Sequence, residues 1–342
     1  MGSLGASMQR ASSKAIRSTM EFVATRIASS DRLMSIAYDL INGDTFGGLE
    51  AHEEMLSDTP RIDAYHSGIH RAIRPGDVVV DLGTGTGVLA LMASKAGAEK
   101  VYAVEHSDFI DVAREIARLN GVTNIEFVRA NSREFTPPEP VDVILHEQMG
   151  DELFNENMLQ NILDLRDRVL RPGGRILPAR LRLFVEPVSL HDDMRIRRFW
   201  NIALPDGIDL AGMERSPVAE RFDTGRNDQF WLRPRSVAST IGEPQPILEF
   251  DLTTLATPFD LETRHTIERT AATDAIVDGC AVWFEAQFDD DTVLSTSPFA
   301  PVTSWGNRVF RFDESVMAGD TVQIDIDLGV LVEPSTWQVR RR

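Results

Sequence analysis

The sequence predicts an α/β fold with a doubly wound parallel sheet, followed by an antiparallel β domain. Between residues 78 and 170, short apolar runs alternate with helical patterns, which is typical of a parallel sheet covered by helices. After Pro178 the helical patterns become rare and strand-like segments dominate. The clearest of these, 321–328, alternates apolar and polar side chains, as a strand with one buried face does. A chain of 342 residues has room for both domains.

The parallel part begins with an apolar run after the turn Arg74-Pro-Gly-Asp77. Strands are expected at 78–81, 101–104, 125–128 and 141–145, and helices at 88–96, 109–120 and 156–170. The run Arg171-Pro-Gly-Gly174 should end the last helix, and the domain should end near Leu177-Pro178. We therefore expect this domain to occupy residues 50–178.

Helical patterns also precede the sheet. Residues 9–41 have the spacing of one or two amphipathic helices, so residues 1–49 are expected to form an N-terminal helical segment. A further helix is expected over 50–70, and Pro60 should kink or restart it because proline removes a helical N–H.

The second half, residues 179–342, is expected to be an antiparallel barrel or sandwich. Strands are expected at 181–188, 247–255, 281–288, 309–312 and 321–328. The stretches 191–200 and 213–222 interrupt these strands with helical patterns. They predict a protruding helical arm over about residues 195–228.

The composition argues against several classes of function. A formal net charge of −18 disfavours nucleic-acid binding, and it fits either a basic substrate or a merely soluble acidic surface. Cys280 is the single cysteine, so we expect no disulfide framework and no metal site. No apolar run reaches membrane-spanning length, and we expect a cytoplasmic protein without membrane contact. Arginine supplies nearly all the positive charge, a bias common in GC-rich bacterial genomes.

A glycine-rich loop follows the first strand of the sheet. Its glycines, Gly83, Gly85 and Gly87, would let the backbone approach a ligand at a helix N-terminus. The loop satisfies the dinucleotide fingerprint, and Glu105 closes the next strand where a ribose-binding acid belongs, so a nicotinamide cofactor stays open. Asp81 ends the strand in the pattern Asp-x-Gly-x-Gly-x-Gly, which favours S-adenosylmethionine (SAM).

Two glutamates flank a short loop at the end of the strand 141–145. Glu147 follows the strand directly, and Glu156 is expected in the first turn of the next helix, with Asn155 as its N-cap. The carboxyl ends of strands in open α/β sheets are where ligands bind. Two carboxylates converging there suit a planar, bidentate cation, so we predict a guanidinium substrate.

Four motifs together resemble the protein arginine methyltransferases. They are HEEMLSDTPR at 52–61, VVVDLGTGTG at 78–87, HEQMGDELFNE at 146–156 and STSPFAPVTSW at 295–305. Their order and spacing make a chance resemblance implausible. The resemblance implies a Rossmann-like class I methyltransferase domain, then an antiparallel β-barrel domain with a helical dimerisation arm, and hence a homodimer.

The resemblance also implies roles for individual residues. Arg61 would bind the SAM carboxylate, and Glu105 would bind the ribose hydroxyls. The rest of the cofactor pocket would comprise Asp81, Gly83, Gly85, Gly87, His106, Asn131, Ser132 and Glu147, with Asn131 and Ser132 near adenine. Catalysis would involve Glu147, Glu156, His52 and Asp58. Substrate contacts would come from Met55, Gln148, Met149, Ser304 and Trp305.

Three departures from the family pattern concern the substrate side. Ser304 stands where the family has histidine, and Gln148 stands where it has tryptophan. The tyrosines that the family places before HEEML are absent, and Gly43 and Phe46 lie near those positions. These departures leave the substrate open between free L-arginine, a peptide or protein arginine, and another small metabolite. A non-catalytic SAM-binding scaffold is a further alternative.

The expected chemistry is methyl transfer to a guanidinium nitrogen. Glu147 and Glu156 would pin the positive charge to one side of the guanidinium, so that one terminal nitrogen gains lone-pair character. Protons would leave through Glu147, or through His52 and Asp58. Because Ser304 cannot carry charge, we expect the second route to be weaker here than in the family.

Overall fold

The structure is a computed structural model that describes residues 48–222 and 228–342. The helices expected over 9–41, together with Gly43 and Phe46, lie outside the described residues. Residues up to 53 belong to a different compact unit from residues 54–342. The description below therefore concerns the second unit, apart from the start of helix α3 (Leu49–Ser57).

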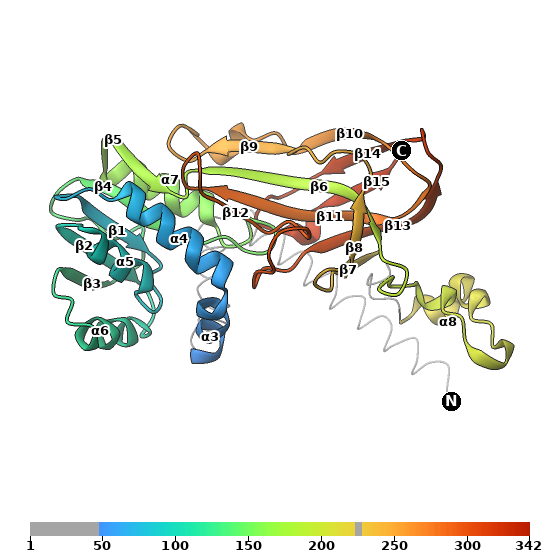
Figure 1. The fold of residues 1–342 in the computed structure, drawn as a ribbon, viewed down its shortest axis with the longest axis horizontal. Helices are drawn as coiled ribbons and strands as arrows, with labels where there is room; N and C mark the ends of the chain where they lie inside the picture. The colour runs from blue at the N-terminus through green and yellow to red at the C-terminus, as the bar shows by residue number, and fades with distance from the viewer. Residues whose placement is uncertain (1–47, 223–227) are drawn as a thin grey trace, which may run out of the picture. The chain divides into compact units, whose positions relative to one another are not determined.

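A parallel sheet forms the first half of the unit (Figure 1). Its strands run in the order β3-β2-β1-β4-β5, and each pairs in parallel with its neighbours. The strands are β1 (Val78–Leu82), β2 (Lys100–Glu105), β3 (Ile125–Arg129), β4 (Val141–His146) and β5 (Leu170–Leu177). The strand order reverses between β1 and β4, and such a switch point opens a crevice at the carboxyl ends of the strands.

The helices of this half follow the predicted alternation. They are α4 (Thr59–Ala72), α5 (Val88–Ala96), α6 (Ile110–Leu119) and α7 (Met158–Val169). The expected break at Pro60 is confirmed: α3 ends at Ser57, and α4 restarts with Asp58 as its N-cap. Proline fits at the start of α4 because the first helical N–H groups have no partner within the helix.

Two predictions near the end of this half are wrong. Helix α7 begins at Met158 with Asn157 as its cap, so Asn155 is not the cap and Glu156 precedes the helix. The run Arg171-Pro-Gly-Gly174 is not a turn but part of β5, which the sequence prediction missed. Its proline and glycines favour a turn locally, but pairing with β4 gives this segment its strand conformation.

The second half is an antiparallel, barrel-like domain, as predicted. One sheet has the order β7-β13-β11-β6-β8, with β12 paired to β11 and β9 paired to β6. The other sheet has the order β10-β14-β15. The strands are β6 (Arg180–Leu190), β7 (Gln229–Trp231), β8 (Val237–Thr240), β9 (Leu248–Asp251), β10 (Arg264–Thr270), β11 (Ala275–Gln287), β12 (Val293–Ser295), β13 (Arg308–Val316), β14 (Thr321–Asp327) and β15 (Gln338–Arg341). The buried face of β14 is the apolar one that alternation predicts, with Val322, Ile324 and Ile326 buried.

The arm differs from its prediction. Residues 191–198 form turns and irregular backbone rather than an α-helix. Three short 3₁₀ helices follow, η1 (Phe199–Asn201), η2 (Pro205–Gly207) and η3 (Ala211–Arg215), and then one α-helical turn, α8 (Pro217–Glu220). Proline and glycine at 205–207 disfavour a longer helix there. The arm exposes large apolar side chains, among them Phe199, Ile202, Leu204, Ile208, Val218 and Phe222.

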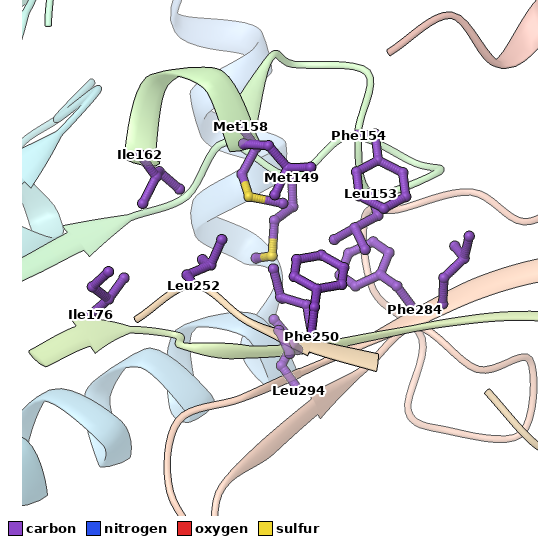
Figure 2. Packing of buried hydrophobic residues seen from close by; sticks show 14 of the residues in the cluster. Met149, Leu153, Phe154, Met158, Ile162, Ile176, Phe250, Leu252, Phe284 and Leu294 are labelled. Atoms are coloured by element: carbon purple, nitrogen blue, oxygen red, sulfur yellow. The ribbon is translucent and has the colours of Figure 1, made fainter. Parts of the chain in front are cut away.

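One hydrophobic core joins the two halves of the unit. Figure 2 shows Met149, Leu153 and Phe154, from the loop after β4, pointing into a cluster with Phe250, Phe284 and Leu294 of the barrel-like domain. Phe154 stacks on Phe250 with ring centroids 5.9 Å apart. The loop that carries Glu147 and Glu156 is thus anchored in the core by the side chains between them.

In the described part of the chain, no helix combines the length and the apolar content that crossing a membrane requires.

Candidate active site

The glycine loop has the backbone conformation for which its sequence is suited. Gly83, Gly85 and Gly87 have φ values of 70°, 51° and 76°, which side-chain-bearing residues rarely adopt. Gly87 is also the N-cap of α5, where a Cβ atom would lie 3.1 Å from the Cβ of Ala113. The loop therefore stays close to α6, and its last glycine, Gly87, brings no side chain to the N-terminus of α5.

Asp81 is buried at the carboxyl end of β1. Its Oδ2 accepts hydrogen bonds from the Thr84 hydroxyl (2.5 Å) and from the Ala90 N–H (3.0 Å). Its Oδ1 is buried without a hydrogen-bond partner. Burial raises the pKa of Asp81 to about 6, although these two hydrogen bonds oppose the rise. A buried acceptor without a partner is costly, which indicates that a ligand donor completes it.

Glu105 lies at the end of β2 and remains ionised across the physiological range. Burial acts to raise its pKa, but hydrogen bonds from His106, Ser107 and the Gly85 N–H outweigh burial and lower the pKa to about 2. The Gly85 N–H donates to Glu105 Oε2 at 3.2 Å, so the acid is tied directly to the glycine loop. This is the environment of a hydrogen-bond acceptor for hydroxyl groups.

The loop after β4 is held from several sides. The Tyr65 hydroxyl donates to the carbonyl of His146 at 2.7 Å, and His146 Nε2 lies 2.8 Å from the carbonyl of Pro178. A Cβ atom on Gly150 would lie 2.1 Å from Asn155 Oδ1, so any larger residue there would force the Asn155 side chain to move. The loop is therefore closely packed against itself at this point.

Glu147 and Glu156 are coupled through their charges. Burial raises the pKa of Glu147 to about 7, against the opposing charge of Arg61 and with the help of Asp58 and Asp81. Burial and then the charge of Glu147 raise the pKa of Glu156 to about 8. Two carboxylates in one partly enclosed space disfavour each other's ionisation, and a cation between them would relieve this. The site is therefore prepared for a positively charged ligand.

Arg61 and Asp58 connect the glutamate loop to the barrel-like domain. Arg61 Nη2 forms an ion pair with Glu147 Oε2, and its guanidinium carbon lies 5.0 Å from the centre of the Trp305 ring. Asp58 Oδ1 accepts from the Arg61 N–H at 3.1 Å. Asp58 Oδ2 accepts from the N–H and the hydroxyl of Ser304, at 2.7 and 3.0 Å. Ser304 thus donates two hydrogen bonds to Asp58, and Ser304 itself carries no charge.

Two family models match this chain. A methyltransferase domain matches residues 79–174, which contain the glycine loop and both glutamates. An arginine methyltransferase oligomerization subdomain matches residues 179–341, which include the arm and the strands β6–β15.

Relatives and solved structures agree with these models. The protein arginine N-methyltransferase 6 of Danio rerio is 33% identical over 288 residues, covering 81% of this chain and 80% of that protein. The protein arginine N-methyltransferase PRMT10 of Oryza sativa subsp. japonica is 32% identical over 313 residues, covering 83% and 82%. The chain belongs to the protein arginine N-methyltransferase family.

Two solved members of the family show the same fold. The PRMT1 enzyme–prozyme heterotetramer of Trypanosoma brucei, in complex with AdoHcy, has a TM-score of 0.69 and 26% identity, covering 83% of this chain and 89% of that one. Arabidopsis thaliana protein arginine methyltransferase 10, in an open conformation, has a TM-score of 0.68 and 28% identity, covering 83% and 88%. The predicted family, fold and SAM cofactor are thereby confirmed.

The residues present fit the SAM that the family uses. The Oδ1 atom of Asp81 is a buried acceptor without a partner, Glu105 would be an ionised acceptor for the ribose, and the N-terminus of α5 follows the glycine loop directly. Arg61, which pairs with Glu147 in this structure, would supply a cation for the carboxylate of the methionine moiety. Among the described residues, no group of three or more histidines, cysteines or acids is placed to hold a metal ion.

Other predicted site residues take the following places. Gln148 points toward the glycine loop: its Oε1 accepts from Asn161 at 3.4 Å, and its Nε2 would lie 3.5 Å from a Cβ atom on Gly83. The Met149 side chain is buried in the core, and its carbonyl accepts from Trp305 Nε1 at 2.6 Å. Met55 is half-buried in α3. A direct substrate contact by any of the three stays a prediction.

The remaining predictions are less constrained by the structure. Asn131 and Ser132 follow β3, where Asn131 Oδ1 accepts from the Arg133 N–H and the Ser132 carbonyl accepts from Arg168. His106 lies beside Glu105, with 3.2 Å between Nδ1 and Oε1. His52 belongs to the separate unit that ends at residue 53. Their roles toward adenine, ribose and the leaving proton stay predictions.

Two acids inside the glutamate loop are absent from the predicted site residues. Asp151 Oδ1 accepts from the Gly306 N–H at 2.7 Å, and Glu152 Oε1 accepts from Arg308 Nε at 2.6 Å. The available signal was the loop's composition: the pair Asp151-Glu152 adds two further carboxylates between Glu147 and Glu156. Acids placed between buried apolar residues need partners, and these acids find them about 155 positions later in the chain.

Proposed function

We propose that this protein transfers the methyl group of SAM to a guanidinium nitrogen of arginine residues in protein substrates. The observation that carries the proposal is the coupled pair Glu147 and Glu156, each with a raised pKa, in the loop that follows β4 beside the switch point of the parallel sheet. The formal net charge of −18 complements basic substrates.

The cofactor, when bound, supplies a methyl group that its sulfonium already activates. The protein must then hold the acceptor in line and polarise it. A guanidinium entering between Glu147 and Glu156 gains two ionic hydrogen bonds, which favour the ionised forms of both acids. Its positive charge is drawn toward the carboxylates, and the nitrogen aimed at the methyl group gains lone-pair character.

The proton released by methylation leaves through Glu147. Burial raises the pKa of Glu147 to about 7 in the site without substrate, and the bound cation lowers this pKa and keeps the carboxylate ionised. The ionised carboxylate can then accept the proton that the methylated nitrogen must lose for the guanidinium to keep its single positive charge. Asp58 is less suited to this task because three N–H or O–H donors already engage its two oxygens. Replacing the family histidine by Ser304 therefore favours the Glu147 route.

Incubation with labelled SAM tests the proposal. We offer an arginine-rich protein, the same protein with every arginine replaced by lysine, free L-arginine, and no acceptor. The proposal predicts label in the first protein and none in its lysine version. Label only in free L-arginine would move the substrate to a small metabolite, and label in none of the acceptors would contradict an arginine methyltransferase.

We also propose that the protein assembles as a homodimer through the arm. The oligomerization subdomain model and the apolar side chains exposed between Phe199 and Phe222 support this assembly. A cytoplasmic location and a bacterial source stay predictions from composition.

A further inference from the structure

The carboxylate of Glu152 is buried in the glutamate loop, with only 1% of the residue exposed. Burial raises its pKa, and the charge of Arg308 opposes that rise. Arg308 Nε donates to Glu152 Oε1 at 2.6 Å across 156 positions of the chain. Glu152 lies between Glu147 and Glu156 in the sequence. Its ion pair with Arg308 lies on the side of the loop that faces β13.

Arg308 also binds strand β7. Its Nη1 donates to Gln229 Oε1 at 2.9 Å, and its guanidinium carbon lies 5.1 Å from the centre of the Trp231 ring. β7 is the first strand after the arm, since the described arm ends at Phe222 and the chain resumes at Asp228. One guanidinium therefore connects the glutamate loop to the strand that returns from the arm.

The backbone of the loop needs such support. Leu153 has a φ of 74°, a left-handed conformation that is unfavourable for a leucine. Strained residues of this kind persist only where their surroundings hold them. On one side Leu153 is buried in the core, and on the other its neighbour Glu152 is held by Arg308. Without Arg308, the buried carboxylate would draw the loop toward solvent.

We propose that Arg308, through Glu152, is a positioning residue that fixes the glutamate loop against β7 and so sets the separation of Glu147 and Glu156. Arg308 itself touches neither SAM nor the substrate. This inference rests on the proposed function, because it concerns the geometry of the guanidinium clamp. It also makes the clamp sensitive to the arm, since movement of β7 would be passed to Glu152 through Arg308.

Arg308→Met and Arg308→Lys test the proposal. Small displacements of a reacting group cost up to about 100-fold in rate, so kcat of Arg308→Met should fall roughly 10- to 100-fold. KM for SAM and the affinity for S-adenosylhomocysteine should stay within about twofold, because the cofactor pocket is not touched. Arg308→Lys keeps the charge but not the fork that reaches both Glu152 and Gln229, and should recover only part of kcat.

Amide hydrogen exchange gives a readout that does not depend on activity. In Arg308→Met, peptides spanning 148–156 should exchange faster than in the wild type, while peptides of β1 and β2 keep their protection. Arg311→Met is the matched control: Arg311 is also on β13 and stacks on Phe230 of β7 at 4.8 Å, but it does not reach the loop. It should leave kcat and the exchange of 148–156 unchanged.

A double variant separates positioning from simple neutralisation of charge. Arg308→Met leaves a buried carboxylate unpaired and can impair folding, whereas Glu152→Gln with Arg308→Met buries no charge. We expect the double variant to fold, to remain slow and to keep the fast exchange, because nothing ties its loop to β7. Wild-type kcat and protection in the double variant would overturn the proposal. If the wild type itself methylates no arginine, the proposed function fails instead, and the exchange result still decides whether Arg308 holds the loop.

Discussion

Two residues of the site, Glu147 and Glu156, lie in an environment that disfavours their charged forms, and a bound cation would relieve this. Burial raises the pKa of Glu147 to about 7 and that of Glu156 to about 8 from the ordinary 4.5, and the charge of Glu147 adds to the rise at Glu156. A ligand cation converts this penalty into binding energy. Active sites commonly sacrifice stability for function in this way.

The stability of the free protein should therefore depend on Glu156 in a pH-dependent manner. The folded-state pKa of Glu156, about 8, lies above its ordinary value of 4.5, so the native state binds the proton more tightly. The contribution of Glu156 to stability is then largest at low pH and falls as the pH rises from about 4.5 through 8. Glu156→Gln should raise the Tm by roughly 2–4 °C at pH 8.5, if about 1 kcal/mol is recovered, and by little at pH 5. Thermal unfolding at the two pH values checks this, and a lower Tm for the variant at pH 8.5 would contradict it.

At the element scale, the long and periodic segments could be predicted from the sequence. β14 has strict alternation over seven residues, and β1 is followed by a glycine loop and a helix, so both signals are local. Strands of three or four residues, such as β7, β12 and β15, carry too little pattern to be seen without their partners. β5 was missed because its proline and glycines have turn propensity, which pairing with β4 overrides.

In the candidate site, too, residues with a local sequence signal could be predicted, and pairs of residues far apart in the chain could not. Asp81, Glu105 and Glu147 could be found because each stands at a strand end or directly after one, and Glu156 because it stands close to the start of the next helix. Arg308, in contrast, stands in an ordinary strand pattern. Because it lies 156 residues from Glu152, no local sequence pattern predicts that the two side chains pair. The Arg61–Glu147 ion pair was missed for the same reason, since the two residues lie 86 positions apart. Long-range pairs between charged side chains are decided by the fold and not by local spacing.

At the scale of the whole molecule, charged contacts fix the base of the arm. Arg195 donates to the buried Asp278 at 2.7 Å, and Arg198 donates to Asp313 at 2.7 Å. Beyond them the arm exposes apolar side chains, which would contact a second copy in the proposed dimer. An arm that is held by ion pairs where it begins and exposes apolar side chains further along suits a specific protein–protein contact better than nonspecific association.

Light scattering tests the assembly directly. The wild-type chain should have the mass of a dimer at micromolar concentration, and replacing Phe199 and Phe222 by serine should shift it to a monomer with an unchanged Tm of the barrel-like domain. Ser304→Ala is a suitable control, because Ser304 lies in the site and not on the arm. A wild-type monomer at that concentration would contradict the proposed assembly.

The proposed guanidinium clamp requires that Glu147 act in the chemistry and hardly at all in retaining the cofactor. Glu147→Gln is nearly isosteric, removes the charge that polarises the guanidinium, and leaves Asp81, Glu105 and the glycine loop in place. Glu249→Gln, at an exposed position of strand β9, controls for the loss of any carboxylate. The decisive measurement is the methyl-transfer rate of each variant beside its affinity for S-adenosylhomocysteine. The clamp predicts that Glu147→Gln loses roughly 100- to 1,000-fold in kcat with nearly wild-type affinity, whereas wild-type turnover by Glu147→Gln would contradict it.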